Sequence, residues 1–285
     1  MASNPAFNRL EQDARSGYAS FQERGAATNP GNAPHAQQGG ADTWGSQQQL
    51  QDMYNSPTAG PVDTGRVTMD DVIMKTLGLF ALVLGFGAVG WVVAAQNPGL
   101  GMILLLGGMF GTLGLGLVIA FKKTLSVPLI VAYAVLEGLF VGAVSQVFEA
   151  AYDGVVPTAA LATAATFAGM FLAYKSGLIK VTDKFRRIVT MMIFGYAIFA
   201  LVNVAFAWIT NTAFGIGGSG ALGIGISLFA VGLASVSLAL DFDMIDRAIA
   251  TGAPQKYSWL LAHGLIVTVV WLYIEFLRLF ARLRE

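Results

Sequence analysis

The chain has 285 residues, of which 55% are hydrophobic and only 12% are charged, and its formal net charge is zero. Soluble domains carry about 25% charged residues, so this composition excludes a soluble globular protein and predicts an integral membrane protein. A nucleic-acid binder would show a dense basic face, and the sequence has none. The absence of cysteine excludes disulfides, thiolate metal sites and a cysteine nucleophile.

The first part of the chain is polar and of low complexity. Residues 1–65 are rich in Asn, Gln, Gly, Ala and Pro, as in "NPGNAPHAQQGGADTWGSQQQLQ". Such a segment buries too little apolar surface to offset its ordering entropy, and its start lacks the apolar run of a signal peptide. We therefore expect a disordered cytoplasmic tail over 1–65 and a transmembrane domain over 66–285.

Apolar runs follow one another from Val72 onward. Each run has a length of about 17–25 residues, which spans a bilayer as a helix. The runs are separated by turn-forming or charged stretches such as "QNPG", "KK" and "TNTAFGIGGSG". The sequence therefore predicts an all-α membrane protein with seven transmembrane helices. These are expected at 72–95, 99–121, 127–148, 157–174, 188–210, 221–240 and 257–280.

Basic residues alternate between the two ends of these helices. Five lie in the tail and first helix, two between the second and third helices, five between the fourth and fifth, and two between the sixth and seventh. The loops at the other end have none, so the positive-inside rule places the N-terminus in the cytoplasm. The expected location is a plasma or inner membrane. Arg278, Arg282 and Arg284 conflict with this pattern. Either the last helix crosses and its arginines sit at the far interface, or it is re-entrant or strongly tilted.

Two acids lie inside the apolar runs. A charged side chain at mid-bilayer costs at least about 2.5–3.5 kcal/mol, so each acid needs a reason. Glu137 lies about ten residues into the third helix, and Glu275 lies in the seventh, with Arg278 three residues later on the same face. A structural hydrogen bond or a local ion pair is one interpretation of each acid. A role in a proton or cation path is the other.

The sixth helix ends in the acidic stretch "LDFDMIDRA". On a helix, Asp241 and Asp243 differ by about 200° and point opposite ways, whereas Asp243 and Asp246 share a face. At a cytoplasmic helix end such acids are ordinary solvated residues. Because Glu275 lies on the next helix, we expect Asp241 to face the interior of the bundle. Asp243 and Asp246 are expected to lie at the cytoplasmic opening of the path or to cap the helix end.

The sequence "GAPQ" at 252–255 predicts where the last hairpin turns. Gly suits the position just after a helix and Pro stops it, so the turn is expected near residue 253. Residues equally far from this point on the two helices then lie at equal depth. Asp243 is thereby placed level with His263.

This pairing predicts a staggered acidic path. Asp241, Asp243 and His263 are expected at the cytoplasmic mouth, and Glu275 about 15 Å deeper than Asp241, near mid-bilayer and at the depth of Glu137. Zinc requires three or four close ligands, so His263 is interpreted as a hydrogen-bonded structural residue. A pH-responsive histidine is the alternative.

Several stretches resemble a known family. They are "YAVLEGLFVGAVSQVFE", "KSGLIKVTDKFRR" and "LDFDMIDRAIATGAPQKYSWLLAHGLIVTVVWLYIEFLRLF". They are similar to the bacterial branch of the Bax-inhibitor family, the transmembrane Bax-inhibitor-motif superfamily. The resemblance covers roughly residues 65–285 and leaves the tail outside.

The resemblance implies seven helices, arranged as three hairpins surrounding a C-terminal helix, and a pH-sensitive calcium leak channel. In the family, two aspartates at the end of the sixth helix and in the seventh act as proton sensor and gate. By motif position Asp241 matches the first acid and Glu275 the second. This chain departs from the pattern because the second acid is Glu, and because the two acids are 34 residues apart, which is longer than the family's spacing. A direct contact between the two carboxyl groups is therefore in question here.

The leading hypothesis is a cation leak channel or transporter gated by protonation, with lipid, protons and Ca²⁺ as partners. Ca²⁺ prefers hard oxygen ligands, and it is expected to bind Asp241 and Glu275 only transiently, so no firm metal site is predicted. The alternative is a non-transporting membrane regulator that binds a membrane protease or other membrane proteins. We predict no cofactor and no enzyme activity, because GxSxG, HExxH and P-loop motifs are absent. The supporting residues of the ion path are expected to be Glu137, Asp243, Arg278 and His263.

Overall fold

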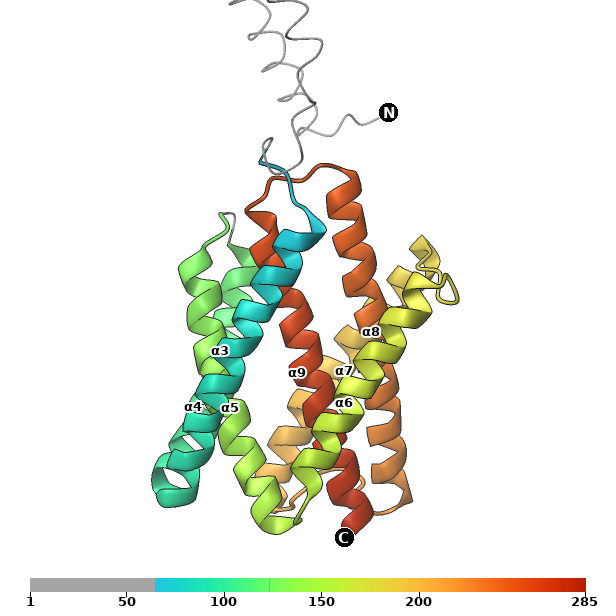
Figure 1. Cartoon of the computed structure of the whole chain (residues 1–285). Helices are drawn as coiled ribbons and strands as arrows, with labels where there is room; N and C mark the ends of the chain where they lie inside the picture. Colours follow the sequence, from blue (N-terminus) through green and yellow to red (C-terminus); the bar gives the residue numbers. More distant parts are fainter. Residues whose placement is uncertain (1–64, 123) are drawn as a thin grey trace, which may run out of the picture. The chain divides into compact units, whose positions relative to one another are not determined.

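The computed structural model describes residues 65–122 and 124–285, so almost all of the predicted tail over 1–65 lies outside the described residues. The described part is all-helical, and each of its seven helices is long and apolar enough to cross a membrane. This confirms the predicted fold class (Figure 1). The helices are α3 (Met69–Gln96), α4 (Pro98–Phe121), α5 (Val127–Ala151), α6 (Val155–Lys175), α7 (Asp183–Thr210), α8 (Ala221–Ala250) and α9 (Tyr257–Arg284).

Short polar side chains set the starts of the first two helices. The Thr68 side chain accepts a hydrogen bond from the Asp71 amide at 3.1 Å and caps α3. Asn97 ends α3, and its side chain accepts from the Leu100 amide at the start of α4. Pro98 occupies the first turn of α4, where its missing N–H costs no hydrogen bond. The "QNPG" stretch therefore forms the expected tight turn between two antiparallel helices.

The turn between α8 and α9 lies where "GAPQ" predicts it. Helix α8 continues to Ala250, ten residues beyond the apolar run that ends at residue 240, and Thr251 caps it. Gly252 follows with φ of +64°, a left-handed conformation that glycine adopts at little cost. The extension carries the acidic stretch beyond the apolar run, so its acids lie at the end of the bundle where α8 meets α9.

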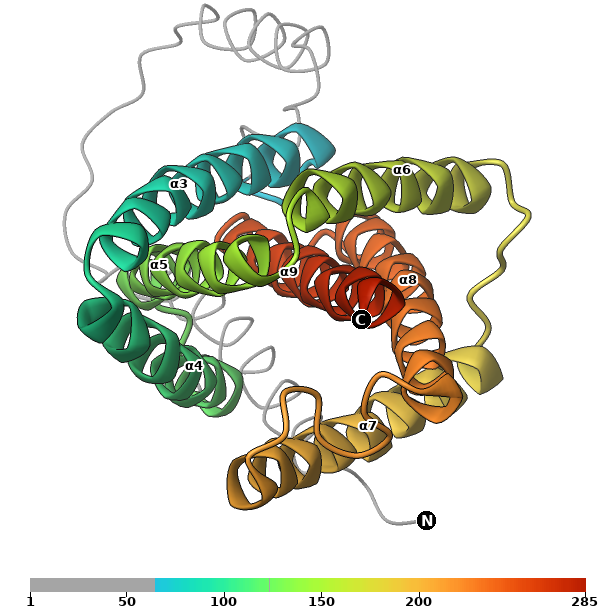
Figure 2. The same ribbon diagram turned by 90° about the horizontal axis from the view of Figure 1, so that it is seen from below.

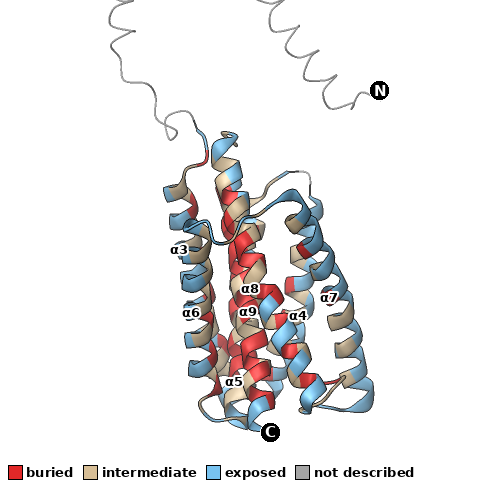
Figure 3. Cartoon of the chain, turned by 90° about the vertical axis from the view of Figure 1, so that its right-hand side faces the viewer, coloured by how far each residue is buried: buried red, intermediate tan, exposed pale blue. Residues whose placement is uncertain are grey.

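Helix α9 forms the core of the bundle. Of its most apolar stretch, 56% is buried inside the protein, compared with 6% for α7. It packs against α3, α5, α6 and α8, and Figures 2 and 3 show it between the other helices, with buried residues along most of its length. Leu272 and Leu277 pack with Leu238 of α8, and Ile266 packs with Ile130 of α5. This central position is the one that the family resemblance implied.

Glycines bring α3 and α5 into backbone contact. A Cβ atom at Gly138 would lie 2.6 Å from the carbonyl oxygen of Val83. At Gly142 it would overlap the carbonyl oxygen of Gly87, and at Gly90 that of Leu139. Without side chains at these positions the two helices approach more closely than Ala or Leu would allow, as is typical of membrane helix pairs.

A buried arginine, Arg282, links the far end of α9 to the α7–α8 connection and to α8. Arg282 is only 5% exposed. Its guanidinium donates hydrogen bonds to the Ser227 hydroxyl at 2.8 Å, to the Phe214 carbonyl at 3.2 Å and to the Gly223 carbonyl. The same group stacks over the Phe214 ring, 5.3 Å from its centroid. The α7–α8 connection is thereby fastened to α9.

A second arginine shows that α9 crosses the whole bundle. Arg284 donates to the Asp153 carbonyl in the loop between α5 and α6. At the opposite end, the start of α9 follows a turn in which Pro254 forms a β-bridge with Arg66. The conflict raised by the basic C-terminal residues is thus resolved in favour of a crossing helix. At the far end, Arg282 donates to Gly223 and Ser227 of α8 and to the Phe214 carbonyl, and Arg284 donates to the Asp153 carbonyl.

Candidate functional site

Three acids with buried oxygen atoms lie on or beside the central helix α9. Glu137 from α5 is 5% exposed, and Glu275 on α9 itself is 3% exposed. Asp241 from α8 is partly buried as a residue, but its Oδ2 atom is buried. Figure 2 shows α9 between α5 and α8, so Glu137 and Asp241 approach it from different helices. Ionisable residues inside membrane bundles mark candidate ion or proton paths.

Glu275 is held by well-placed donors. Its Oε1 accepts hydrogen bonds from the Tyr196 hydroxyl of α7 at 2.7 Å and from the Trp271 indole at 3.1 Å. Arg278 lies 3.5 Å away and forms the ion pair that the sequence spacing predicts. The ring of Tyr196 also stacks on Trp271. These contacts describe a neutralised carboxylate that links α7 to the centre of the bundle.

Asp241 has an unsatisfied oxygen. Its Oδ2 is buried and has no hydrogen-bond partner among the described residues. The nearby polar group is the Thr268 hydroxyl of α9, which itself lies 3.2 Å from the Gly264 carbonyl and can donate its proton there. A buried carboxylate oxygen without a donor is costly. The position is therefore suited to a proton, a water molecule or a cation.

Glu137 repeats this situation on the α5 side. Its Oε2 is buried and has no hydrogen-bond partner in the part of the chain described. The neighbouring hydroxyl is that of Tyr133, one helical turn earlier. The Tyr133 ring meets His263 of α9 edge-on, with ring centroids 4.4 Å apart. The Glu137 carboxyl group, the Tyr133 phenol and the His263 imidazole thus lie one after another along the contact between α5 and α9.

Contacts along α5 and α9 fix the depth of Glu137. Tyr133 packs on His263, and Ser145 is hydrogen-bonded to Tyr273 at 2.7 Å. The two helices run in the same direction, and twelve residues of α5 correspond to ten of α9 between these contacts. Glu137 is therefore level with the residues of α9 that lie three or four positions after His263.

Contacts between α8 and α9 give the depth of Asp241. Ser227 is hydrogen-bonded to Arg282. Asp241 lies fourteen residues after Ser227 on α8, and Thr268 lies fourteen residues before Arg282 on the antiparallel α9. This pairing agrees with the closeness of Asp241 and Thr268. Glu275 lies seven residues further along α9, which is about 10 Å deeper.

These depths correct two expectations and answer the open question about the two acids. Glu137 was expected at the depth of Glu275, but it lies near the level of Asp241, because α5 starts beside the beginning of α9. Asp241 is level with Thr268 of α9, and Glu275 lies two helical turns deeper, about 10 Å and not the expected 15 Å. Each has its own neighbours, so they do not form a directly bonded carboxyl pair.

The expected acidic mouth is not formed. The Oδ2 atom of Asp243 accepts hydrogen bonds from Arg186 of α7 at 2.6 Å and Arg247 at 2.8 Å. Asp246 accepts from the Tyr174 hydroxyl of α6 at 2.9 Å. His263 is buried on the face of α9 that meets α5. The α8–α9 pairing places Asp243 level with Ile266, three residues past His263. The argument from equal depth also ignored the direction in which each side chain points around its helix.

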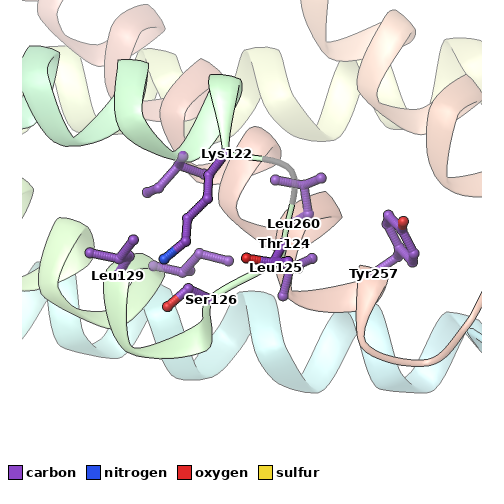
Figure 4. Close-up of a pocket in the computed structure, with 9 residues that line it drawn as sticks. Lys122, Thr124, Leu125, Ser126, Leu129, Tyr257 and Leu260 are labelled. Carbon is purple, nitrogen blue, oxygen red and sulfur yellow. The ribbon is translucent and has the colours of Figure 1, made fainter.

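No resident metal centre emerges from this arrangement. Across residues 65–122 and 124–285, no three His, Asp or Glu side chains converge as metal ligands would. A pocket of about 180 Å³ lies apart from the three acids, at the α4–α5 connection, where it is lined by Lys122, Ser126 and Tyr257 among others (Figure 4). A cation near Asp241 would therefore have to use carboxyl, hydroxyl, main-chain and water oxygens.

Sequence reasoning missed the partners of the acids. Trp271 lies four residues before Glu275, a spacing that places both on one helix face and could have identified it. Thr268 and Tyr133 also lie within apolar runs near predicted acids. Tyr196 lies in another helix 79 residues away from Glu275. Only the packing of α7 against the bundle brings it to the site.

The fold and the buried acids define the class of protein, a multi-pass membrane protein with polar groups around a central helix. A family model described as Bax inhibitor 1 like matches residues 4–285. The chain therefore belongs to this family, as the motifs indicated. The match begins near the N-terminus, so the expectation that the resemblance starts near residue 65 was wrong. A comparison with curated proteins finds no matching sequence.

Proposed function

We propose that the protein is a pH-sensitive cation leak channel or transporter, with Ca²⁺ as its expected ion. The observation that supports this function most directly is the pair of unsatisfied carboxyl oxygens of Asp241 and Glu137. They lie at similar depth on two sides of α9. A structural acid would be expected to have its oxygens hydrogen-bonded, whereas an ion or proton site needs oxygens that can accept a transient partner.

The proposed mechanism depends on the charge of these two acids. With protons bound, Asp241 and Glu137 are neutral, and the apolar surroundings of α9 oppose the entry of a cation. When the protons are lost, both carboxylates are negative at the same depth of the bundle, so they repel each other. Their oxygens are then hard ligands of the kind that Ca²⁺ prefers. Flux is therefore expected to rise as the pH rises through the titration of these groups.

Glu275 has a different proposed role in the same mechanism. Its carboxylate is already neutralised by Arg278 and held by Tyr196 and Trp271. It therefore serves as a fixed connection between α7 and α9, and it lies about 10 Å deeper in the bundle than Asp241. An ion that passes Asp241 meets this ion pair next, so movement of Arg278 away from Glu275 would complete the path.

The test is Ca²⁺ flux into dye-loaded liposomes that contain the purified chain, measured over a series of pH values. We expect the wild-type flux to rise with pH, and Asp241→Asn and Glu137→Gln to abolish most of this rise. Asp70→Asn is the matched control, because Asp70 is an exposed acid at the start of α3 and its loss should leave the flux unchanged.

Two results would overturn this proposal. Unchanged pH dependence in both Asp241→Asn and Glu137→Gln would show that the unsatisfied oxygens do not control flux. A wild-type chain that carries no cation at any pH would favour the other hypothesis from the sequence, a non-transporting regulator that binds membrane-protein partners.

A further inference from the structure

Helices α3 and α6 border an apolar groove on the outside of the bundle. Two adjoining pockets, of about 350 and 420 Å³, share the lining residues Thr76, Leu77, Phe167 and Leu265. Because they share these residues, they form one continuous depression, which we call the α3–α6 groove. Its walls belong to α3 and α6 and its floor to α8 and α9.

The groove exists because its two walls do not touch. Both α3 and α6 pack against α9, but they make no helix–helix contact with each other in the part of the chain that the structure describes. Figure 2 shows them on the same side of the central helix. Small residues on α6, namely Ala160, Thr163 and Ala164, keep the space between them open.

The groove is long enough to reach from the membrane interface to the middle of the bilayer. Along α3 it extends over sixteen residues from Met69 to Leu84, which is about 22 Å of helix. The hydrocarbon core of a bilayer is about 30 Å thick, so one leaflet contributes about 15 Å. The groove therefore covers the interface and one leaflet, and it ends near the middle of the bundle. A lipid acyl chain has this shape and chemistry.

The interfacial end of the groove carries three polar side chains, one of them a lysine, within an otherwise apolar lining. It is lined by Tyr174, Lys175 and Asp246. Asp246 already accepts the Tyr174 hydroxyl, whereas Lys175 has no ion-pair or hydrogen-bond partner within the described ranges. The connection that follows α6 adds Lys180 and then Lys184 at the start of α7. Basic residues at a membrane surface attract anionic lipid head groups.

We propose that the α3–α6 groove binds an anionic phospholipid of the adjacent leaflet. One acyl chain lies along the groove against Phe167 and Leu265, and the phosphate lies at Lys175. The site is separate from the three buried acids, and the proposal does not depend on cation transport.

Native mass spectrometry of the detergent-solubilised full chain tests this site. The protein is incubated with equal amounts of phosphatidylglycerol and phosphatidylcholine of the same acyl length. We expect wild type to retain phosphatidylglycerol about fivefold more than phosphatidylcholine, which corresponds to about 1 kcal/mol for one lysine contact. Lys175→Gln should reduce this preference to near equality, whereas Lys184→Gln should keep most of it.

A second variant tests the groove itself. Ala164 is an exposed groove residue, so Ala164→Phe fills the space without entering the packed core. It should lower the retention of both lipids. Ala197→Phe on α7 is the matched control, because Ala197 is exposed to the membrane away from the groove. Wild type without lipid preference, or equal retention in Ala164→Phe and wild type, would overturn the proposal.

Discussion

Arg282 shows at the scale of one residue how a charge can be buried at a helix end. Its guanidinium bonds to Ser227 and to the carbonyls of Gly223 and Phe214. A planar fork with several donors can serve these acceptors together, whereas a lysine offers one compact charge. Lys therefore does not replace Arg at this position, although the charge is the same.

We accordingly predict that Arg282→Lys lowers the free energy of unfolding by about 1.5–3 kcal/mol, because hydrogen bonds to a charged group are lost and carbonyls stay buried without donors. Thermal unfolding of the purified protein in detergent measures this. Leu283→Ala is the control, since Leu283 is 57% exposed and its loss should have little effect. Equal stability of Arg282→Lys and wild type would contradict the predicted role.

Glu275 leads to a second prediction at this scale. Glu275→Gln keeps an oxygen that accepts from Tyr196, but it leaves Arg278 without its counter-charge. We expect a loss of about 1–3 kcal/mol in unfolding free energy. We also expect a rise in cation flux, because Arg278 is no longer held at position 275 and its movement away completes the proposed path. Asp153→Asn, an exposed acid at the far end, serves as the control in both assays. Unchanged stability would indicate that the ion pair contributes nothing.

The sequence predicts which buried acids occur but not how their oxygens are satisfied. Glu137 and Glu275 are identified by charge within an apolar run, and Arg278 by its spacing on one helix. The difference between the donor-rich Glu275 and the unsatisfied Asp241 depends on which neighbours face each carboxyl group. Those neighbours belong to other helices, and their rotation about the helix axes is set by packing.

At the scale of helices, the contact between α3 and α5 depends on glycine. We predict that Gly142→Ala destabilises the protein by about 1–3 kcal/mol, because the added methyl group overlaps the Gly87 carbonyl and forces the backbones apart. Gly169→Ala on α6 is the matched control. A methyl group there meets open space, so it should be neutral or stabilise the helix by up to about 1 kcal/mol. Both effects are read from thermal unfolding, and similar effects of the two changes would contradict the prediction.

The helix boundaries illustrate the limits of apolar patterning. The runs predict all seven helices, because bilayer length and hydrophobicity are properties of the sequence itself. The patterning ends the sixth helix at residue 240, whereas α8 continues to Ala250 as an amphipathic extension. There the stop signal at Gly252, and not hydropathy, determines the end. The composition of a helix does not say which other helices it packs against. The close contact between α3 and α5 was therefore not predicted from the sequence.

The orientation of the whole bundle gives a further prediction. Because the chain has no cysteine, single cysteines can be introduced without a competing thiol. Thr251→Cys and Asp153→Cys lie at opposite ends of the bundle and both are exposed. In intact cells, a membrane-impermeant thiol reagent should label Asp153→Cys and spare Thr251→Cys. The reverse pattern would contradict the predicted cytoplasmic N-terminus, and labelling of Glu285→Cys should follow that of Asp153→Cys.

For the molecule as a whole, order of synthesis matters because of where α9 lies. The six helices that the structure describes before it leave the ribosome first, yet the faces of α3, α5, α6 and α8 that pack on α9 lack this partner until α9 is present. Such incomplete intermediates are prone to misassembly. We therefore expect these faces to contact lipid until α9 has been inserted. We expect insertion of α9 to complete the core of the bundle. Arg282 and Arg284 then hold its far end in place.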